Sequence, residues 1–128
     1  MAVIANKREL KTIQEHEKLN TVYAIDNPVN GGANHLYRVE ANTQDDKNIP
    51  YVLIQFQQGA RKEENSIHGL IDSDLLEIVR DRLTAFQNGE FACEHNAKAL
   101  DYVEAALKEL NKRVEDRINR KVLGTNNV

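Results

Sequence analysis

Two apolar stripes at helical spacing, between Asp72 and Arg120, constrain the fold of this chain more than any other feature of its sequence. The first stripe consists of Leu75, Ile78, Val79, Leu83 and Phe86, and the second of Leu100, Val103, Leu107, Leu110, Val114 and Ile118. Both have the three- and four-residue spacing of an amphipathic helix. Isolated helices are marginally stable in water, so each stripe must be buried against another surface. Because only residues 87–91 separate the two segments, the sequence predicts a helical hairpin.

The segment before the hairpin is typical of short β-strands. Strand-forming runs, separated by polar turns, cover residues 21–25, 35–41 and 49–57, and residues 66–70 are a candidate for a short fourth strand. In the second run, side chains at 36, 38 and 40 are expected on one face and those at 37, 39 and 41 on the other. The acidic start of residues 72–74 is expected to cap the first helix. The predicted fold class is α+β: a small antiparallel β-sheet packed on a long C-terminal helical hairpin.

The predicted domain organisation is a single domain with a short segment at each end. Residues 1–20 are interpreted as an N-terminal arm or short helix, because residues 7–20 are mostly charged and have weak helical spacing. The sheet-plus-hairpin domain covers residues 21–121, and residues 122–128 form a tail. The sheet has exposed edges, and the second helix, at roughly 40 Å, is longer than the sheet is wide. Both features favour a homo-oligomer built on two-fold symmetry.

Composition and charge exclude several classes of function. The chain has 128 residues and a formal net charge of -3, which argues against general binding of DNA or RNA because that function needs a broad basic surface. Its single cysteine, Cys93, excludes an internal disulfide framework and fits a reducing cytoplasm. The first residues lack the pattern of a signal peptide, and no run approaches the length of a membrane span. We therefore expect neither a nucleic acid nor a membrane as the partner.

Three kinds of residue in the hairpin are not explained by packing alone. Asn96 lies four residues before Leu100, in the apolar stripe, and Phe86 ends the first stripe at the turn. Beside the second stripe, three arginines form a row at positions i, i+4 and i+7: Arg113, Arg117 and Arg120. An aromatic face, an amide and guanidinium groups together suit a nucleobase and its phosphates.

Each of these residues also has a purely structural interpretation. Asn96 can bond the spare backbone groups of a helix's first turn, and Phe86 can belong to the core. The arginines can pair with Glu109 and Asp116 on the helix surface, and can offset the helix dipole. Three arginines in place of lysines favour recognition of phosphate or carboxylate by the planar guanidinium. Both interpretations remain open from these residues alone.

Catalysis and metal binding have little support in the sequence. Cys93, Glu94 and His95 are adjacent, so on a helix their side chains point in different directions. The four histidines lack metal-ligand spacing, and residues 30–32 lack the fingerprint of a phosphate-binding loop. We therefore predict a protein that is not an enzyme and needs no metal or cofactor. The competing class is a helical-hairpin module for protein–protein interaction, and a DNA-binding regulator is disfavoured by the acidic balance.

Several runs of the sequence resemble a family of phage proteins. Residues 69–83 (GLIDSDLLEIVRDRL), 86–87 (FQ) and 91–97 (FACEHNA) are similar to the helical hairpin of phage anti-Thoeris proteins. These are the first type of Thoeris anti-defence sponge, and their hairpin is shared with an anti-CBASS sponge. Residues 30–37 (NGGANHLY) and 54–59 (IQFQQG) resemble the family's sheet segment. The resemblance covers roughly residues 21 to 120.

The resemblance implies a non-enzymatic sponge in the cytoplasm of an infected bacterial host. Such proteins bind cyclic ADP-ribose isomers, including glyco-cyclic ADP-ribose, and hold them without cleavage, so that a defence effector receives no signal. Family members form dimers that associate into hexamers as trimers of dimers, and some also hold cyclic oligonucleotides at separate sites. The implied ligand-binding residues are Phe86, Asn96 and Arg113, and we expect Arg117 of the same or a neighbouring chain to assist Arg113. For the second site, the implied candidates are Arg61 and Lys98.

Overall fold

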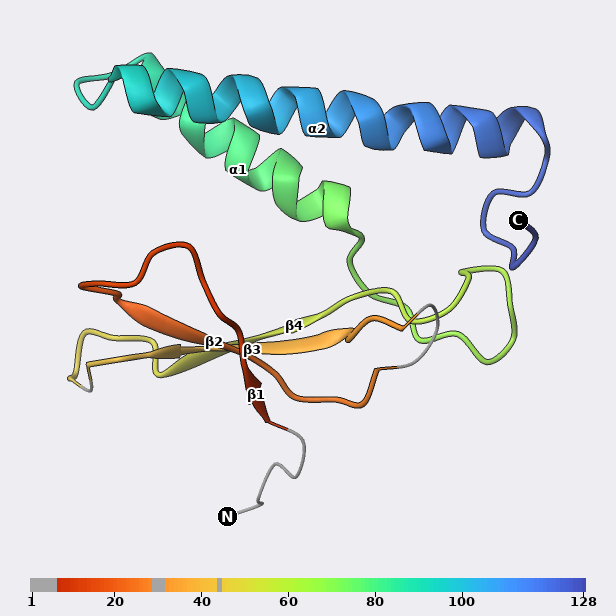
Figure 1. Ribbon diagram of the computed structural model, residues 1–128, viewed down its shortest axis with the longest axis horizontal. Helices are drawn as coiled ribbons and strands as arrows, with labels where there is room; N and C mark the ends of the chain where they lie inside the picture. The colour runs from red at the N-terminus through yellow and green to blue at the C-terminus, as the bar shows by residue number, and fades with distance from the viewer. Residues whose placement is uncertain (1–6, 29–31, 44) are drawn as a thin grey trace. The chain divides into compact units, whose positions relative to one another are not determined.

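The computed structural model describes residues 7–28, 32–43 and 45–128, and divides into two compact units. The sheet unit contains the described residues up to Gly59 together with Ser66–Gly69. The helical unit contains Ala60–Asn65 and Leu70–Val128. Within the described residues, the elements follow the order β1, β2, β3, β4, α1, α2 along the chain (Figure 1). The α+β class predicted from the sequence is confirmed.

The sheet is an antiparallel meander in which neighbours in sequence are neighbours in space. Among the described residues its strand order is β1-β2-β3-β4, with all pairs antiparallel. The strands are β1 (Arg8–Glu9), β2 (Asn20–Ala24), β3 (Leu36–Ala41) and β4 (Tyr51–Gln55). The three strands predicted from the sequence are therefore confirmed to within about two residues, an accuracy normal for element ends. The segment 66–70 does not form a continuous strand and contains an isolated antiparallel pairing of Ile67 with Gln58.

The strand register separates an apolar face of the sheet from a charged one. Val22, Val39 and Val52 are directly opposite one another, and the next apolar row pairs Ala24, Tyr37 and Ile54. Ala24 is fully buried, which places the centre of the sheet unit's small core on this face.

The opposite face carries an ionic and aromatic cluster. Arg38 lies 3.7 Å from the centre of the Tyr51 ring, and Glu40 pairs with Lys7 at 3.0 Å. The alternation predicted for residues 36–41 is thus confirmed.

The N-terminal segment is extended and does not form the short helix considered for residues 7–20. Arg8 pairs with Ala24 and Glu9 with Tyr23, and the Leu10 N–H donates to the Val22 carbonyl at 2.9 Å. The free edge of β2 offers partners for backbone hydrogen bonds, whereas a short helix with no surface to pack against is only marginally stable in water. The predicted loop at residues 30–34 lies partly outside the described residues, and Gly32 adopts the positive φ of 84° expected there.

The helical unit contains the predicted hairpin. Helix α1 (Asp72–Gln87) and helix α2 (Glu94–Asn119) run antiparallel to each other (Figure 1). The N-cap of α1 is Ile71, whose N–H donates to Asp74 Oδ2 at 3.0 Å, so the expected acidic cap is supplied by Asp74. Within the described chain, neither helix is long and apolar enough to span a membrane. The packing of the sheet on the hairpin remains a prediction.

One ionic contact joins the two helices. Arg80 Nε donates to Glu104 Oε2 at 2.9 Å, and its Nη1 lies 3.3 Å from Glu77 Oε1. The hydrogen bond to Glu104, with the second one to Glu77, raises the pKa of Arg80 above its ordinary value. Because the guanidinium lies at the surface, the contact orients α1 against α2 more than it stabilises them.

We predict that Gly69→Ala destabilises the sheet unit. A Cβ at this position would lie 2.5 Å from the Gln55 carbonyl oxygen and 2.7 Å from the Phe56 carbonyl carbon. Both are backbone atoms, so the strand end must shift, at an expected cost of about 1–3 kcal/mol in urea unfolding. The matched control is Gly89→Ala, whose nearest contact of 3.6 Å is ordinary and leaves the unfolding midpoint nearly unchanged. An unchanged midpoint for Gly69→Ala would contradict this close approach.

We also predict an acid-sensitive contribution from Asp26 to the stability of the sheet unit. Burial raises the pKa of Asp26, but hydrogen bonds from the His35 N–H at 2.9 Å and Asn34 Nδ2 at 3.0 Å outweigh it and hold the pKa below its ordinary value. A carboxylate whose pKa is lower in the folded than in the unfolded protein stabilises the fold. Its full contribution is present above the pKa of the unfolded state and is lost as the pH falls through the pKa of the folded state. Asp26→Asn should therefore melt at a lower temperature than the unaltered chain at neutral pH, and the difference should shrink below about pH 4. A difference independent of pH would contradict the prediction.

Candidate functional site

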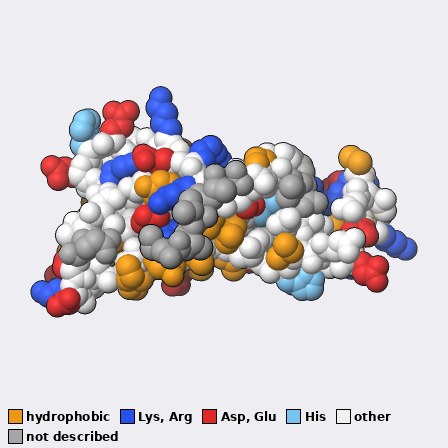
Figure 2. Space-filling model, turned by 90° about the horizontal axis from the view of Figure 1, so that it is seen from below, with side chains coloured by type: hydrophobic (Ala, Val, Ile, Leu, Met, Phe, Trp, Pro, Cys, Tyr) orange, Lys and Arg blue, Asp and Glu red, His pale blue; other side chains and the backbone are white. Residues whose placement is uncertain are grey.

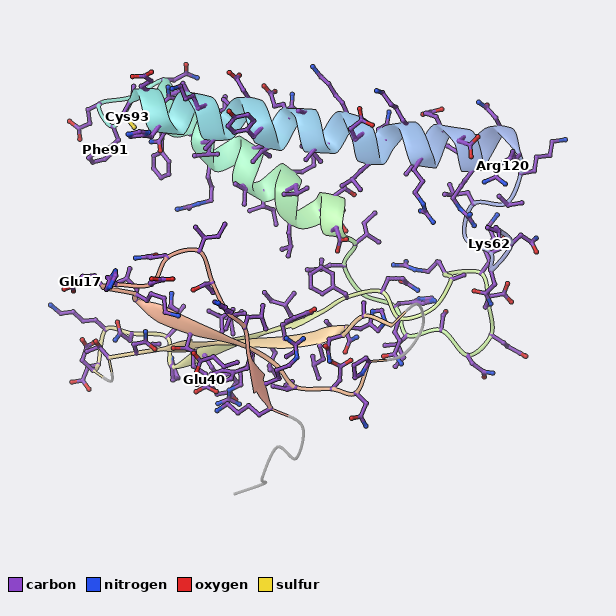
Figure 3. The ribbon with its side chains drawn as sticks, in the orientation of Figure 1. Glu17, Glu40, Lys62, Phe91, Cys93 and Arg120 are labelled. Atoms are coloured by element: carbon purple, nitrogen blue, oxygen red, sulfur yellow. The ribbon has the colours of Figure 1, made fainter. Side chains whose placement is uncertain are left out.

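Two phenylalanine rings mark the turn of the helical hairpin. Phe86, half-buried, lies in the last turn of α1, and Phe91 lies in the turn with 67% of its surface exposed. Their ring centres are 6.4 Å apart and their planes meet at 81°. Figure 3 shows Phe91 at this end of the hairpin, next to Cys93. Such an edge-to-face pair leaves aromatic surface available to a planar ligand.

A guanidinium group lies over the Phe86 ring of this pair. Arg82, one helical turn before Phe86, has its Cζ 5.3 Å from the Phe86 ring centre. In the part of the chain that the structure describes, Arg82 has no ion pair, and it is exposed. A cation beside an aromatic surface can bind the phosphate of a ligand whose base stacks on the ring. Arg82 and Phe91 were not predicted as site residues from the sequence, although the i, i+4 spacing of Arg82 and Phe86 was a usable signal.

Asn96 connects the turn to the first turn of α2. Its Nδ2 donates to the Phe91 carbonyl at 3.4 Å, and its backbone N–H donates to the Cys93 Sγ at 3.4 Å. The turn is also closed by Gln87, whose Oε1 accepts from the Cys93 N–H at 3.0 Å. The amide of Asn96 therefore has a structural contact, but a long one that a ligand can replace. Asn96 and Phe86 thus both contact Phe91, through its carbonyl and its ring respectively, and their role in one ligand site stays a prediction.

Arg113 lies far from this cluster within the same chain. It is exposed on α2, 17 residues beyond Asn96, which corresponds to about 25 Å along a helix. Within the described residues it forms no ion pair, since Glu109 binds Lys112 at 2.7 Å. One chain therefore does not bring all three predicted residues around a single small ligand.

The other two arginines of the row are engaged with the chain itself. Arg117 is only 8% exposed, and its Nη2 donates to the carbonyls of Val122 at 2.9 Å and Thr125 at 3.0 Å. Arg120 binds Asp116 on the helix surface at 3.0 Å, as its structural interpretation expected. The ligand-binding role of Arg117 remains a prediction, and the contacts seen here are structural.

The two residues predicted for a second site lie at opposite ends of the helical unit. Arg61 belongs to the loop Ala60–Asn65, in which the Lys62 N–H donates to the Gly124 carbonyl, beyond the end of α2. Lys98 lies in the second turn of α2 and pairs with Glu94 at 3.1 Å. About 30 Å of helix separates Lys98 from the end of α2. A site that uses both residues needs more than one copy of the chain.

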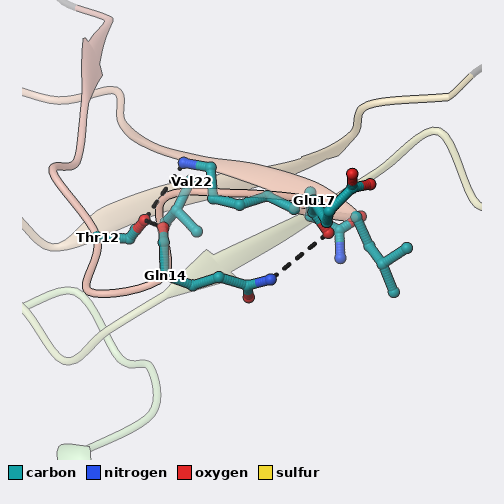
Figure 4. A pocket seen from close by; sticks show the side chains of 7 residues that line it. Thr12, Gln14, Glu17 and Val22 are labelled. Atoms are coloured by element: carbon teal, nitrogen blue, oxygen red, sulfur yellow. Dashed lines mark hydrogen bonds between the residues drawn. The ribbon is translucent and has the colours of Figure 1, made fainter.

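The sheet unit has an open pocket that the sequence analysis missed. Its volume is about 470 Å³, and it is lined by Thr12, Gln14, Glu17, Lys18, Leu19, Asn20 and Val22 (Figure 4). Lys18 Nζ donates to Thr12 Oγ1 at 3.2 Å, and Gln14 Nε2 donates to the Glu17 carbonyl at 3.5 Å. Glu17 has a positive φ of 56°, which bends the chain around the pocket. Among the described residues, no group of three acidic, histidine or cysteine side chains is placed to hold a metal ion.

Comparison with known proteins places the helical hairpin in a family. The family model of the Acb2/Tad1 hairpin domain matches residues 48–115. A curated relative, Thoeris anti-defense 1 of Bacillus phage SBSphiJ7, is 43% identical over 72 residues, which are 56% of this chain and 50% of the relative. The chain thus spans about half the length of the curated relative it matches. Because the matched segment covers more than half of the sequence and contains Phe86, Asn96 and Arg113, the chain belongs to the Acb2/Tad1 hairpin domain family.

Proposed function

We propose that this chain is a phage anti-defence sponge that binds a cyclic ADP-ribose-type signalling nucleotide and holds it without cleavage. The hairpin family and the relative named Thoeris anti-defense 1 support an action against Thoeris immunity. The protein would act in the cytoplasm of the infected bacterium, where the signal is made. By the same mechanism, cyclic oligonucleotides held at a second site would block CBASS immunity.

The observation that carries this proposal is the cluster of Phe86, Phe91, Arg82 and Asn96 at the hairpin turn. Phe86, with Phe91 at its edge, would stack on the adenine, a contact worth about 1–3 kcal/mol in comparable systems. Asn96 would bond a ribose hydroxyl or the base edge. Arg82 would approach the pyrophosphate through charge-assisted hydrogen bonds. These are the donors and ring faces that a cyclic nucleotide needs.

We infer that Arg113 completes the site from a second copy of the chain. In an antiparallel pair of α2 helices with its two-fold axis near residues 104–105, Arg113 of one copy lies at the same height along the helix axis as Asn96 of the other. Arg113 shares a helix face with Tyr102, eleven residues earlier, since that spacing is close to three full turns. Tyr102 is 72% exposed, and the small side chains of Ala105 and Ala106 beside it would receive the ring of a second copy.

The distribution of charge along α2 supports the antiparallel arrangement. Residues 94–104 carry three acids and one base, namely Glu94, Asp101, Glu104 and Lys98. Residues 105–119, up to the end of α2, carry four bases and three acids, which are Lys108, Lys112, Arg113, Arg117, Glu109, Glu115 and Asp116. An antiparallel pair therefore places the acidic half of one helix beside the basic half of the other.

Enclosure between two copies also meets the affinity that a sponge requires. To remove a signal from its effector, the protein needs nanomolar binding, which corresponds to about -12 kcal/mol. A site closed by two preformed helices loses little conformational freedom on binding and strengthens each polar contact. Assembly as a dimer, and further into a hexamer, is part of the proposal.

We predict that Phe86→Ala and Arg113→Ala each weaken binding of glyco-cyclic ADP-ribose while leaving the helical content unchanged. Loss of one stacked base corresponds to about 5- to 150-fold in affinity, and loss of a charge-assisted contact to a similar factor. Calorimetric titration measures both effects, and circular dichroism monitors the fold. The matched control is Arg120→Ala, which removes an arginine paired with Asp116 and should retain the original affinity. Unaltered binding by Arg113→Ala would contradict the proposed site.

A mixing experiment tests whether the site is shared between two copies. Asn96→Ala and Arg113→Ala chains are each expected to bind weakly. Random pairing of the two variants makes half of the dimers mixed, and each mixed dimer has one site with both original residues. After co-refolding, calorimetry should therefore recover about a quarter of the sites at near-original affinity. No recovery would place the whole site within one chain.

The competing function is a protein–protein interaction module. The exposed aromatic rings of Phe91 and Tyr102 favour it, since such side chains are common at protein interfaces. Figure 2 shows bases and acids interspersed on the face drawn, without one broad basic patch, which supports neither DNA nor RNA as a partner. If the chain is an interaction module, cyclic nucleotides will produce no heat in the titrations above.

A further inference from the structure

The side chain of Arg117 organises the segment that follows α2. Its Nη2 donates to the carbonyls of Val122 and Thr125, and in the described chain it has no carboxylate partner. Burying a guanidinium is costly unless its donors are satisfied, and carbonyl groups beyond a helix C-terminus are favourable acceptors for it. The Val122 carbonyl also accepts from Thr125 Oγ1 at 2.6 Å. Residues 122–125 thus fold into a compact turn around the buried cation.

The same turn contacts the loop Ala60–Asn65. The Lys62 N–H donates to the Gly124 carbonyl at 2.9 Å, and the Asn126 N–H donates to Glu63 Oε1 at 3.3 Å. Gly124 has a φ of 78°, and a Cβ there would lie 3.1 Å from Lys62 Cγ. Figure 3 shows Lys62 next to the end of α2 that carries Arg120. A continuous series of contacts therefore runs from Arg117 through the tail to the loop.

We propose that Arg117 is a positioning residue that fixes the loop 60–65, and with it Arg61, against the end of α2. We call the contacts among Arg117, residues 122–126 and loop 60–65 the C-terminal clasp. The clasp stands on the geometry alone. Its consequence for ligand binding, namely control of the second site through Arg61, rests on the function proposed above. Arg117 then affects ligands indirectly, whereas a direct contact would require its guanidinium to leave both carbonyls.

Hydrogen exchange at the Lys62 amide tests the clasp, because that N–H donates to the tail. The variants are Arg117→Gln, a chain ending at Lys121, and the combination of both. Each is expected to speed exchange at Lys62 by about tenfold, and the combination by no more than the truncation alone. Arg113→Gln, one turn earlier, is the matched control and should leave this exchange unchanged. Arg117→Lys, which keeps a charged donor, should restore part of the protection.

Two results would overturn the proposal. One is unchanged exchange at Lys62 in Arg117→Gln, and the other is a combined variant that exchanges faster than the truncated chain. If Arg117→Gln does not fold, Gly124→Ala is the substitute test of the clasp. It strains the tail and crowds the Lys62 side chain, and it does not change the sequence of α2. Gly124→Ala must then speed exchange at Lys62. If the proposed second site is wrong, the unaltered chain will not bind cyclic trinucleotides, while hydrogen exchange in the clasp variants still follows the pattern given above. The two failures are therefore distinguishable.

Discussion

The packing of α1 against α2 is the constraint on which the candidate site depends. The two helices pack against each other and the chain reverses direction between them, although the stripe residues Ile78, Val79 and Ile118 remain exposed, contrary to the burial expected from the sequence. That reversal is closed by Gln87, Cys93 and Asn96 through hydrogen bonds. The rings of Phe86 and Phe91 come together at the turn as a consequence. The same packing makes α2 a long straight element that separates its two ends by more than the length of a small ligand.

This separation explains why the helical unit suggests a shared site. In our proposal, a cyclic nucleotide contacts both the aromatic end of the hairpin and Arg113 only when a second copy of the chain is present. The opposite charge of the two halves of α2 favours the antiparallel arrangement that this requires. The long second helix thus serves both as scaffold and, in our proposal, as the means of assembling the ligand site.

The three arginines of α2 show how the surroundings decide the role of one residue type. Arg120 binds a carboxylate on its own helix, and Arg117 is buried against backbone carbonyls. Arg113 is exposed and forms no ion pair within the described residues. Their sequence spacing is the same helical pattern, so spacing alone gave all three the same interpretation. The fold of the tail, which depends on contacts distant in sequence, distinguishes them.

The parts of the fold that were predictable from the sequence are those set by local pattern. The limits of the hairpin follow from apolar spacing and from the turn residues, and the two faces of β3 follow from alternation. Strand β1 was not predictable, because two residues carry little local preference and their pairing depends on the free edge of β2. For the site, the sequence indicated Phe86 and Asn96. It missed Phe91, because the geometry of the turn, and not spacing, brings the ring to Phe86.

Calorimetric titration with glyco-cyclic ADP-ribose, followed by heating the complex and identifying the released molecule, tests the central claim most directly. The account predicts nanomolar binding, about one ligand per chain as expected for two equivalent sites in a two-fold dimer, and release of the intact cyclic nucleotide. Absence of heat at micromolar protein would contradict the sponge and favour the interaction module. Recovery of a cleaved product would contradict it in a different way, because the protein would then be an enzyme.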